Sequence, residues 1–305
     1  MLNVIRLKNR SWYYSKPFKE IIMEPQVTTV QPDNTAVRTA LWRALHVEAD
    51  ASPHIIEDEI GLKLIAPPND WKERPDMKYT TRIRASIVAR ARFVEDLIVE
   101  QSKRGISQYV ILGAGLDTFA QRRQDIASTL QIYEIDQPDT LTWKQQRLVE
   151  LGFGIPDNLH FVPVNFETTS WWTALINKGF NPNIPTVLVS TGVTLYLTKA
   201  VIIETLNSIK QMAVGSVVAV TFYLPIESID EEDRPLMEMS IKGAKASGTP
   251  MISFFKPNEI ISLASEAGFK DAKTISTKDM EQRYFADRTD KLLPASGEVF
   301  LLATI

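Results

Sequence analysis

The 305-residue sequence contains no cysteine, which excludes disulfide bonds, thiolate nucleophiles and zinc sites with cysteine ligands. This absence also fits a reducing compartment, so we expect a cytoplasmic protein. No stretch approaches the roughly 18–20 apolar residues of a membrane-spanning helix. The net charge of −3, from 34 basic and 37 acidic residues, excludes a strong overall field toward nucleic acid or anionic lipid. The 44% apolar and 23% charged residues are ordinary for a globular protein.

Residues 1–30 are interpreted as an N-terminal arm. Its first nineteen residues carry basic side chains, such as Arg6 and Lys8, and no acidic one. A secretory signal peptide needs an apolar segment, which is missing here. We expect a solvated or docked arm, and an organelle transit peptide or a membrane-surface arm remains an alternative.

The hydrophobic pattern after the arm predicts helices first and then an alternation of strands and helices. Apolar residues at helical spacing predict helices over 34–50 and 81–103. Alternating strands and helices specify parallel strands with crossover helices, hence a doubly wound α/β sheet. The expected strands are 108–112, 130–135, 159–164, 185–190 and 216–222, and the helices between them lie near 138–151, 170–178 and 199–213.

The last quarter of the chain is expected to complete the sheet. Residues 228–247 are interpreted as a helix over its open edge, and 256–269 as a capped helix. Two final strands, near 271–276 and 297–304, are expected to form an antiparallel pair. No repeat or flexible linker interrupts this pattern, which indicates one domain.

The clearest chemical signal is the turn Gly113-Ala114-Gly115, where the run QYVIL ends. A dinucleotide fingerprint needs a third glycine at the position of Thr118. A phosphate-binding loop needs a Gly-Lys-Ser/Thr sequence, which does not follow. A strand that ends in Gly-x-Gly still allows a ligand to approach the backbone closely. The alternative is a tight turn without a ligand.

Polar residues also end the next two predicted strands. Asp136, at the end of the second strand, is placed to accept hydrogen bonds from ribose hydroxyls. Asn165, after the third, is placed to meet an adenine amino group. Glycine turn, acid and amide in this order suit an adenosine ligand without a pyrophosphate, and S-adenosylmethionine is the commonest on such a fold. The alternative for Asp136 is a helix cap.

Five consecutive segments resemble motifs of the leucine carboxyl methyltransferase-like family, and its bacterial branch is the closest match. The similarity covers roughly residues 33–225, and it implies a Rossmann-like class I methyltransferase fold with S-adenosyl-L-methionine as cofactor. The domain over 31–305 then divides into a helical cap (31–104), a cofactor-binding core (105–225), a lid-like insert (226–255) and a sheet completion (256–305). The five segments are RARFVEDLI, ISQYVILGAGLDTFAQR, YEIDQPDTLTWKQQRL, HFVPVNFETTSWW and STGVTLYLTKA.

The resemblance also implies roles for single residues. The family arginine that binds the methionine carboxylate matches Arg90, whose alternative is a surface helix arginine. The Gly-x-Gly turn matches Gly113 to Gly115, and the ribose acid matches Asp136. The adenine pair falls on Asn165 and Phe166, where the family has Asp-Leu. Thr191 stands where the family commonly has glutamate, which affects the expected cofactor affinity or substrate type.

We therefore expect an S-adenosylmethionine-dependent O-methyltransferase that methylates a carboxylate of a small molecule or peptide end by in-line displacement. An ionised carboxylate needs no general base. No catalytic residue and no metal site is assigned. His46, His54 and His160 are interpreted as structural; for a hydroxyl acceptor, His54 and Tyr196 are the weak base candidates. Weak candidates for contacts to an acidic substrate are Lys78, Tyr79, Arg82 and Tyr196.

Two other function classes remain open at this point. A nucleotide-dependent oxidoreductase is disfavoured by the missing third glycine. A protein that binds S-adenosylmethionine without turnover, for regulation, is favoured by Thr191. The sequence predicts neither the methyl acceptor nor the oligomeric state.

Overall fold

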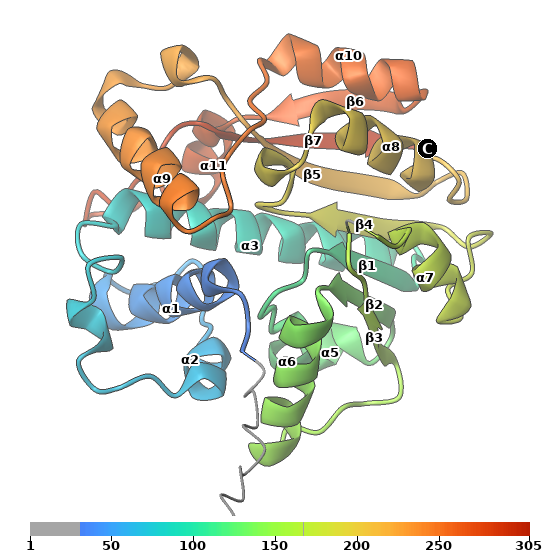
Figure 1. Cartoon of the computed structure of the whole chain (residues 1–305), viewed down its shortest axis with the longest axis horizontal. Helices are drawn as coiled ribbons and strands as arrows, with labels where there is room; N and C mark the ends of the chain where they lie inside the picture. Colours follow the sequence, from blue (N-terminus) through green and yellow to red (C-terminus); the bar gives the residue numbers. More distant parts are fainter. Residues whose placement is uncertain (1–30, 167) are drawn as a thin grey trace, which may run out of the picture.

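The computed structural model describes residues 31–166 and 168–305, so the predicted N-terminal arm lies outside the described residues. A seven-stranded sheet of order β3-β2-β1-β4-β5-β7-β6 crosses the molecule (Figure 1). Its first five strands run parallel, and β7 pairs antiparallel with both β5 and β6. The doubly wound sheet and its antiparallel C-terminal pair are thus confirmed. The strands are β1 (Gln108–Leu112), β2 (Gln131–Asp136), β3 (Leu159–Pro163), β4 (Thr186–Ser190), β5 (Val217–Tyr223), β6 (Lys270–Ile275) and β7 (Glu298–Thr304).

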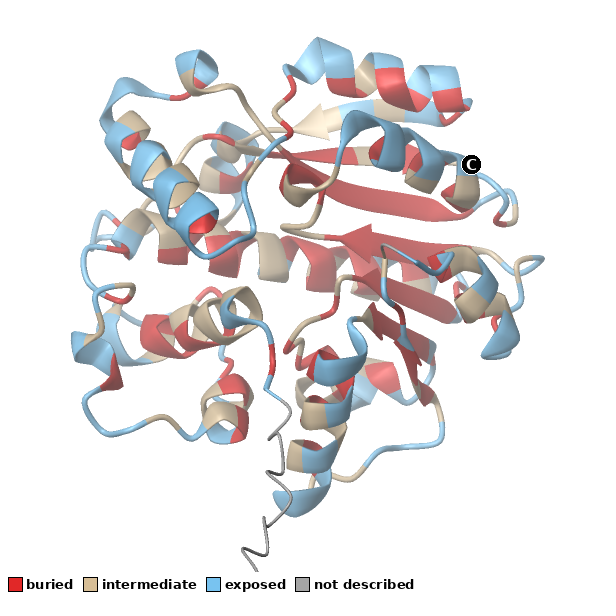
Figure 2. Ribbon diagram, viewed as in Figure 1, coloured by how far each residue is buried: buried red, intermediate tan, exposed pale blue. Residues whose placement is uncertain are grey.

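Two layers of helices cover the two faces of the sheet, and the five parallel strands and β7 are largely buried, whereas β6 at the edge is not (Figure 2). Alternate residues of β1 point to opposite faces: Tyr109 and Ile111 join one core cluster, and Val110 and Leu112 join the other. The first cluster lies under α3 (Thr81–Lys103), α4 (Phe119–Arg122), α5 (Gln124–Ala127), α6 (Pro138–Glu150) and α11 (Thr277–Tyr284). The second lies under α7 (Trp171–Asn177), α8 (Lys199–Ile209) and α10 (Pro257–Ala267).

The first N-terminal helix packs on the long helix α3. Helix α1 (Asn34–Ala49) begins at the cap Asp33, whose side chain accepts a hydrogen bond from the Thr35 backbone N–H. A separate small core forms where α1 meets α2 (Ile60–Ile65) and the short turn η1 (Trp71–Glu73). This packing brings the start of α1 to the carboxyl ends of the central strands.

The region expected as one helix over 228–247 is instead two short turns followed by a shorter helix. The turns are η3 (Ile226–Ser228) and η4 (Glu231–Asp233), and α9 (Arg234–Ala246) follows. Ile229 has extended backbone angles between the turns, and a proline lies in the first turn of α9, where it favours helix initiation. Helix α11 was not predicted, although the capping box of Ser276 and Asp279 is a sequence signal for it.

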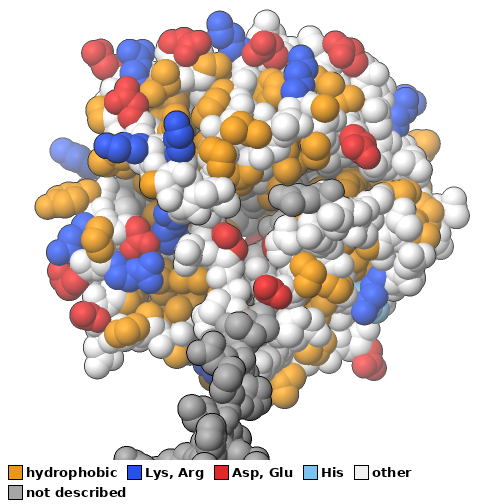
Figure 3. Space-filling view, viewed as in Figure 1, with side chains coloured by type: hydrophobic (Ala, Val, Ile, Leu, Met, Phe, Trp, Pro, Cys, Tyr) orange, Lys and Arg blue, Asp and Glu red, His pale blue; other side chains and the backbone are white. Residues whose placement is uncertain are grey.

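The outer surface fits the small net charge. Acidic and basic side chains are interspersed over the face drawn in Figure 3. Within the described ranges, no helix has both the length and the apolar character needed to cross a bilayer.

Candidate functional site

A cavity of about 520 Å³ lies at the carboxyl ends of β1, β2 and β4. The strand order reverses between β1 and β4, and a crevice at such a switch point is the usual ligand site of an open α/β sheet. The expected residues on its wall are Arg90, Gly113, Ala114, Gly115, Asp136, Phe166, Thr191 and Tyr196. The structure therefore brings eight sequence-predicted positions to one cavity.

The turn after β1 is fastened to the end of β2. The backbone N–H groups of Gly113 and Ala114 both donate to the Ile135 carbonyl, at 2.9 and 3.0 Å. Asp136 accepts a hydrogen bond from the Gly115 N–H at 2.6 Å through Oδ2 and from the Gln137 N–H at 2.7 Å through Oδ1. Burial raises the pKa of Asp136 above its usual value, although both N–H donors favour the carboxylate. Asp136 thus shapes the turn as well as facing the cavity.

Both glycines of the turn are needed for contacts within the chain. Gly113 and Gly115 have φ values of +81° and +52°, which favour glycine. A Cβ at Gly113 would overlap Cγ2 of Val193, in the loop after β4, and one at Gly115 would lie 3.1 Å from Cβ of Ala36 in α1. The expectation that the glycines mainly make room for a ligand is therefore incomplete, because Val193 and Ala36 occupy the nearest space.

Arg90 reaches the cavity from the middle of α3. Its Nη1 donates to Glu298 at 3.0 Å and lies 3.4 Å from the Tyr223 hydroxyl. Burial alone would lower the pKa of the guanidinium, but the Glu298 carboxylate outweighs it and the pKa lies above its usual value. A Cβ at Gly192 would lie 3.2 Å from both Nη atoms, so the glycine allows the guanidinium to pack on the backbone beside Thr191. The alternative of a surface helix arginine does not fit a side chain that is only 13% exposed.

Only one of the two residues predicted to contact adenine lines the cavity. Phe166 lines the cavity, whereas Asn165 is not part of its wall. The Asn165 carbonyl accepts the backbone N–H groups of Thr168 and Thr169, at 3.1 and 2.9 Å, and forms the turn that follows β3.

Two buried charge clusters support the floor of the site. Glu134 and Lys144 form an ion pair with both side chains fully buried, and burial raises the pKa of Glu134 to about 7. On the other side, Arg43 donates to Asp58 at 2.6 Å and to the Leu116 carbonyl at 2.7 Å, which anchors the glycine turn to α1. Each charged side chain of these two clusters has an oppositely charged partner within the chain.

Three of the four weak substrate candidates lie outside the cavity wall. Tyr79 is 95% exposed and is not part of the cavity wall. The Arg82 guanidinium forms a two-point ion pair with Asp233, at 2.6 and 2.8 Å, and these contacts direct it away from the cavity. Lys78 is likewise outside the wall and pairs with Glu73 at 2.9 Å. These three positions correct the sequence-based expectation: Lys78 and Tyr79 lie in the turn before α3, and Arg82, in the first turn of α3, faces Asp233.

The histidines also lie outside the cavity wall. His46 bonds Asp50 at 2.8 Å and accepts the Ile55 N–H at 3.0 Å, which is a structural arrangement. His54 contacts the Asp50 carbonyl, and His160 stacks on Tyr133. Burial raises the pKa of Tyr196, so its hydroxyl stays protonated at neutral pH.

Several wall residues were not predicted from the sequence. The loop 248–252 and the start of α1 both contribute to the wall. Arg43, Glu95, Tyr109 and Arg122 join them from four different elements. Only tertiary packing brings these side chains together, so no local pattern marks them.

Comparison with known proteins identifies related sequences. The family model of leucine carboxyl methyltransferases matches residues 36–210. The Bacillus subtilis (strain 168) protein named "Putative S-adenosyl-L-methionine-dependent methyltransferase YktD" is 33% identical over 221 residues, which cover 71% of this chain and 72% of YktD. A Mycolicibacterium smegmatis relative with the same description is 35% identical over 154 residues, which cover 50% of this chain and 49% of that relative.

Solved structures of low sequence identity share the fold. A candidate methyltransferase from Thermobifida fusca YX has a TM-score of 0.57 at 16% identity, covering 93% of this chain and 98% of that one. A DUF574 family protein from Streptomyces avermitilis has a TM-score of 0.55 at 12% identity, covering 90% and 98%. These likenesses concern the arrangement of helices and strands alone.

Proposed function

Because the chain belongs to the leucine carboxyl methyltransferase family, we propose that it methylates a carboxylate of a small molecule or peptide end. The chain is an S-adenosyl-L-methionine-dependent methyltransferase, and its sheet with N-terminal helices is the class I methyltransferase fold. Within 31–305 we assign a helical cap (31–104), a cofactor-binding core (105–225), an insert (226–255) and a sheet completion (256–305).

The observation that carries the proposal is the convergence of Arg90, the glycine turn and Asp136 on one cavity. A cofactor with a carboxylate at one end and a ribose in the middle needs a cation and an acceptor on the same wall. Arg90 would hold the methionine carboxylate, and Asp136 the ribose hydroxyls. Each carboxylate oxygen of Asp136 accepts one backbone N–H and keeps acceptor capacity, since a carboxylate offers about four lone-pair sites. Phe166, which lines the cavity, would contact the adenine.

The choice of a carboxylate acceptor rests on the groups that the cavity offers. Within the described residues its wall contains no histidine and no lysine. Its carboxylates are engaged: Glu95 pairs with Arg122, Asp117 accepts the Phe119 N–H, and Asp33 caps α1. An acceptor carboxylate is ionised at neutral pH, with a pKa of about 4, and needs no base. The wall therefore suits an acceptor that brings its own negative charge.

When bound, S-adenosylmethionine would supply a methyl group from its sulfonium centre to the acceptor oxygen, with the C–S bonding pair left on sulfur. An acceptor that is already an ionised carboxylate would need no proton transfer. The task of the chain is to align the reactants and exclude water. The loop 248–252 and the start of α1 line the cavity together with the strand ends.

The proposal is tested first by calorimetry with S-adenosylmethionine and S-adenosylhomocysteine. Labelled methyl donor is then supplied with pools of small organic acids and peptides. A carboxyl methyl ester releases its label as volatile methanol in mild alkali, whereas a methyl ether or methylamine retains it. We expect alkali-labile product. Alkali-stable product would contradict the carboxylate acceptor, and cofactor binding without transfer to any pool would favour the non-catalytic alternative.

A further inference from the structure

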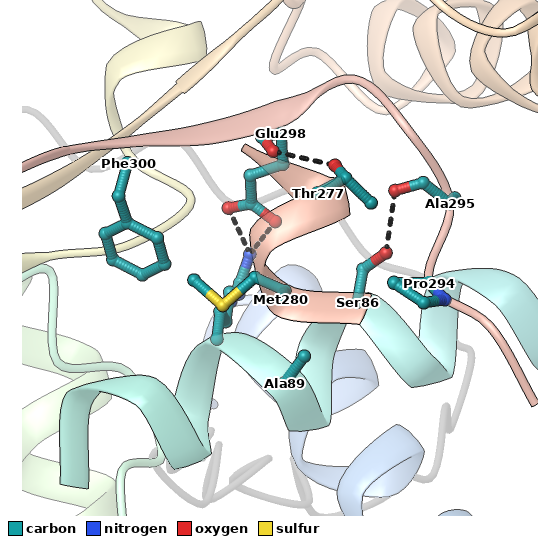
Figure 4. A pocket seen from close by; sticks show the side chains of 9 residues that line it. Ser86, Ala89, Thr277, Met280, Pro294, Ala295, Glu298 and Phe300 are labelled. Atoms are coloured by element: carbon teal, nitrogen blue, oxygen red, sulfur yellow. Dashed lines mark hydrogen bonds and ion pairs between the residues drawn. The ribbon is translucent and has the colours of Figure 1, made fainter. Parts of the chain in front are cut away.

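The guanidinium of Arg90 is held from behind by Glu298, the first residue of the last strand. Both Glu298 oxygens contact Nη1, at 3.0 and 3.3 Å, and the Tyr223 hydroxyl lies 3.4 Å from the same atom. The two side chains of the ion pair are only 13% and 11% exposed. Figure 4 shows the Glu298 carboxylate directed toward α3. Its contacts leave the Nε–Nη2 edge of the guanidinium to other partners.

The segment that carries Glu298 is itself fixed to α3. The Ala295 N–H donates to the Arg82 carbonyl at 3.1 Å, and the Ser86 hydroxyl donates to the Ala295 carbonyl at 3.1 Å. The Thr277 hydroxyl donates to the Glu298 carbonyl at 3.1 Å. These bonds lie around the ion pair in Figure 4. Because backbone and carboxylate are both anchored, Glu298 acts as a rigid support.

Packing restricts the guanidinium on its remaining sides. The space behind the ion pair is about 20 Å³, enough for a single water. In front, the Gly192 backbone lies against both Nη atoms. Arg90 therefore cannot withdraw from the cavity without breaking the contact with Glu298.

Arg90 has a carboxylate partner although Thr191, which stands where the family commonly has glutamate, cannot supply one. The loop after β4 brings Thr191 and Gly192 to the cavity, and the guanidinium of Arg90 lies beside Gly192. The acidic partner of Arg90 is Glu298 of β7, which follows it in the sequence by 208 residues.

We infer that Glu298 is a positioning residue that fixes Arg90 so that its free edge meets the methionine carboxylate of the cofactor. The inference rests on the proposed function, in which Arg90 binds that carboxylate. Two effects of Glu298 oppose each other: its charge partly neutralises Arg90, and its contacts fix the orientation. Orientation dominates here, because a planar fork binds a carboxylate at two points only when it is correctly aimed.

The experiment compares two ligands that share the adenosine part. S-adenosylhomocysteine carries the amino-carboxyl tail, and 5′-methylthioadenosine lacks it. We expect Glu298→Ala to weaken S-adenosylhomocysteine about tenfold or more, as for a charge-assisted contact, with 5′-methylthioadenosine affected less than about twofold. Glu298→Gln keeps the shape and one acceptor, so it should recover part of the loss. If Glu298→Ala does not fold, Glu298→Gln carries the comparison.

Two controls separate positioning from general damage. Glu100→Gln removes the partner of Arg104 on the same helix, away from the cavity, and should leave both affinities unchanged. In an Arg90→Ala background, Glu298→Ala should have no further effect on S-adenosylhomocysteine. Dissociation constants come from calorimetry, and thermal unfolding checks that each variant is folded.

Distinct results would overturn the inference and the proposed function. Unchanged or tighter S-adenosylhomocysteine binding in Glu298→Ala, with Arg90→Ala weakened, would refute positioning and leave the function intact. Equal losses for the two ligands would show a purely structural ion pair. Failure of the unmodified protein to bind either ligand would instead refute the proposed function.

Discussion

Replacement of Asp136 tests the centre of the site. Asp136→Ala removes the acceptor of two backbone N–H groups, those of Gly115 and Gln137. A buried donor left without a partner costs about 1–3 kcal/mol. Because the cavity lies beside Gly115, water can reach that donor, so we expect a total stability loss of about 1–3 kcal/mol rather than twice that amount.

Asp136→Ala should also weaken ligand binding by more than its lower stability alone explains. Hydrogen bonds from ribose hydroxyls to a carboxylate are worth about 1.5–3 kcal/mol, which corresponds to roughly tenfold to hundredfold weaker binding. S-adenosylhomocysteine and 5′-methylthioadenosine should lose affinity equally, because both contain the ribose. Asp136→Asn should give a smaller loss, since its amide keeps one acceptor but directs an NH₂ group at one of the two donors.

Calorimetry with both ligands, together with chemical denaturation, checks these values. Asp125→Asn serves as the control, because this carboxylate is exposed and pairs with Arg123 on the surface of α5. The affinity should also fall on acidification, and the raised pKa of Asp136 moves this loss to higher pH than for an ordinary aspartate. Unchanged affinity in a folded Asp136→Ala variant would refute the ribose assignment and leave Asp136 as a turn clamp.

Four further predictions concern the site and its surroundings. Lys144→Met should lower the free energy of unfolding by about 3–5 kcal/mol, because it leaves the buried Glu134 unpaired, and denaturation of the double variant Lys144→Met/Glu134→Leu should recover most of the loss. The pKa of Glu134, about 7 against an ordinary 4.5, makes its contribution to stability fall as pH rises through 7, so Glu134→Gln should flatten the change in stability between pH 5 and 8. Gly113→Ala should lower the melting temperature through overlap with Cγ2 of Val193, and added Val193→Ala should restore part of it, because Cβ of Val193 is 3.7 Å away; no restoration would disprove this contact. Tyr196→Phe should keep kcat within a few-fold from pH 7 to 9, since a carboxylate acceptor needs no base, and a collapse of kcat would favour a hydroxyl acceptor.

The sheet could be predicted because its signals are local. The buried parallel strands β1 and β4 are continuous apolar runs, and residues such as Gly105 separate them from helices with a clear apolar stripe. The antiparallel final pair was also predictable from two strands late in the chain. Helix α9 was predicted to begin too early, because the charged run before it resembles a helix start yet folds as short turns.

The candidate site was predictable only where each strand end carries its own signal. Gly113, Asp136 and Thr191 directly follow or end strands, so the topology alone brings them together. Arg90 came from the family resemblance, and its partner Glu298 has no local pattern that links it to α3. Tyr79 and Arg82 were predicted to face the site because they lie near a motif in the sequence. Proximity in the sequence does not set the direction of a side chain, and neither residue lines the cavity.

The position of β7 has a consequence for the order in which the molecule can be completed during synthesis. β7 follows β6 in the sequence, yet it lies between β5 and β6 and supplies the acid behind Arg90. Without β7 the sheet would end at β5, because β6 joins it through β7, and Arg90 would lack the Glu298 carboxylate. Long-range pairing of this kind forms late. Pairing of β7 therefore joins two events, completion of the sheet and placement of a carboxylate beside Arg90, so we expect a chain that lacks β7 to bind the cofactor more weakly.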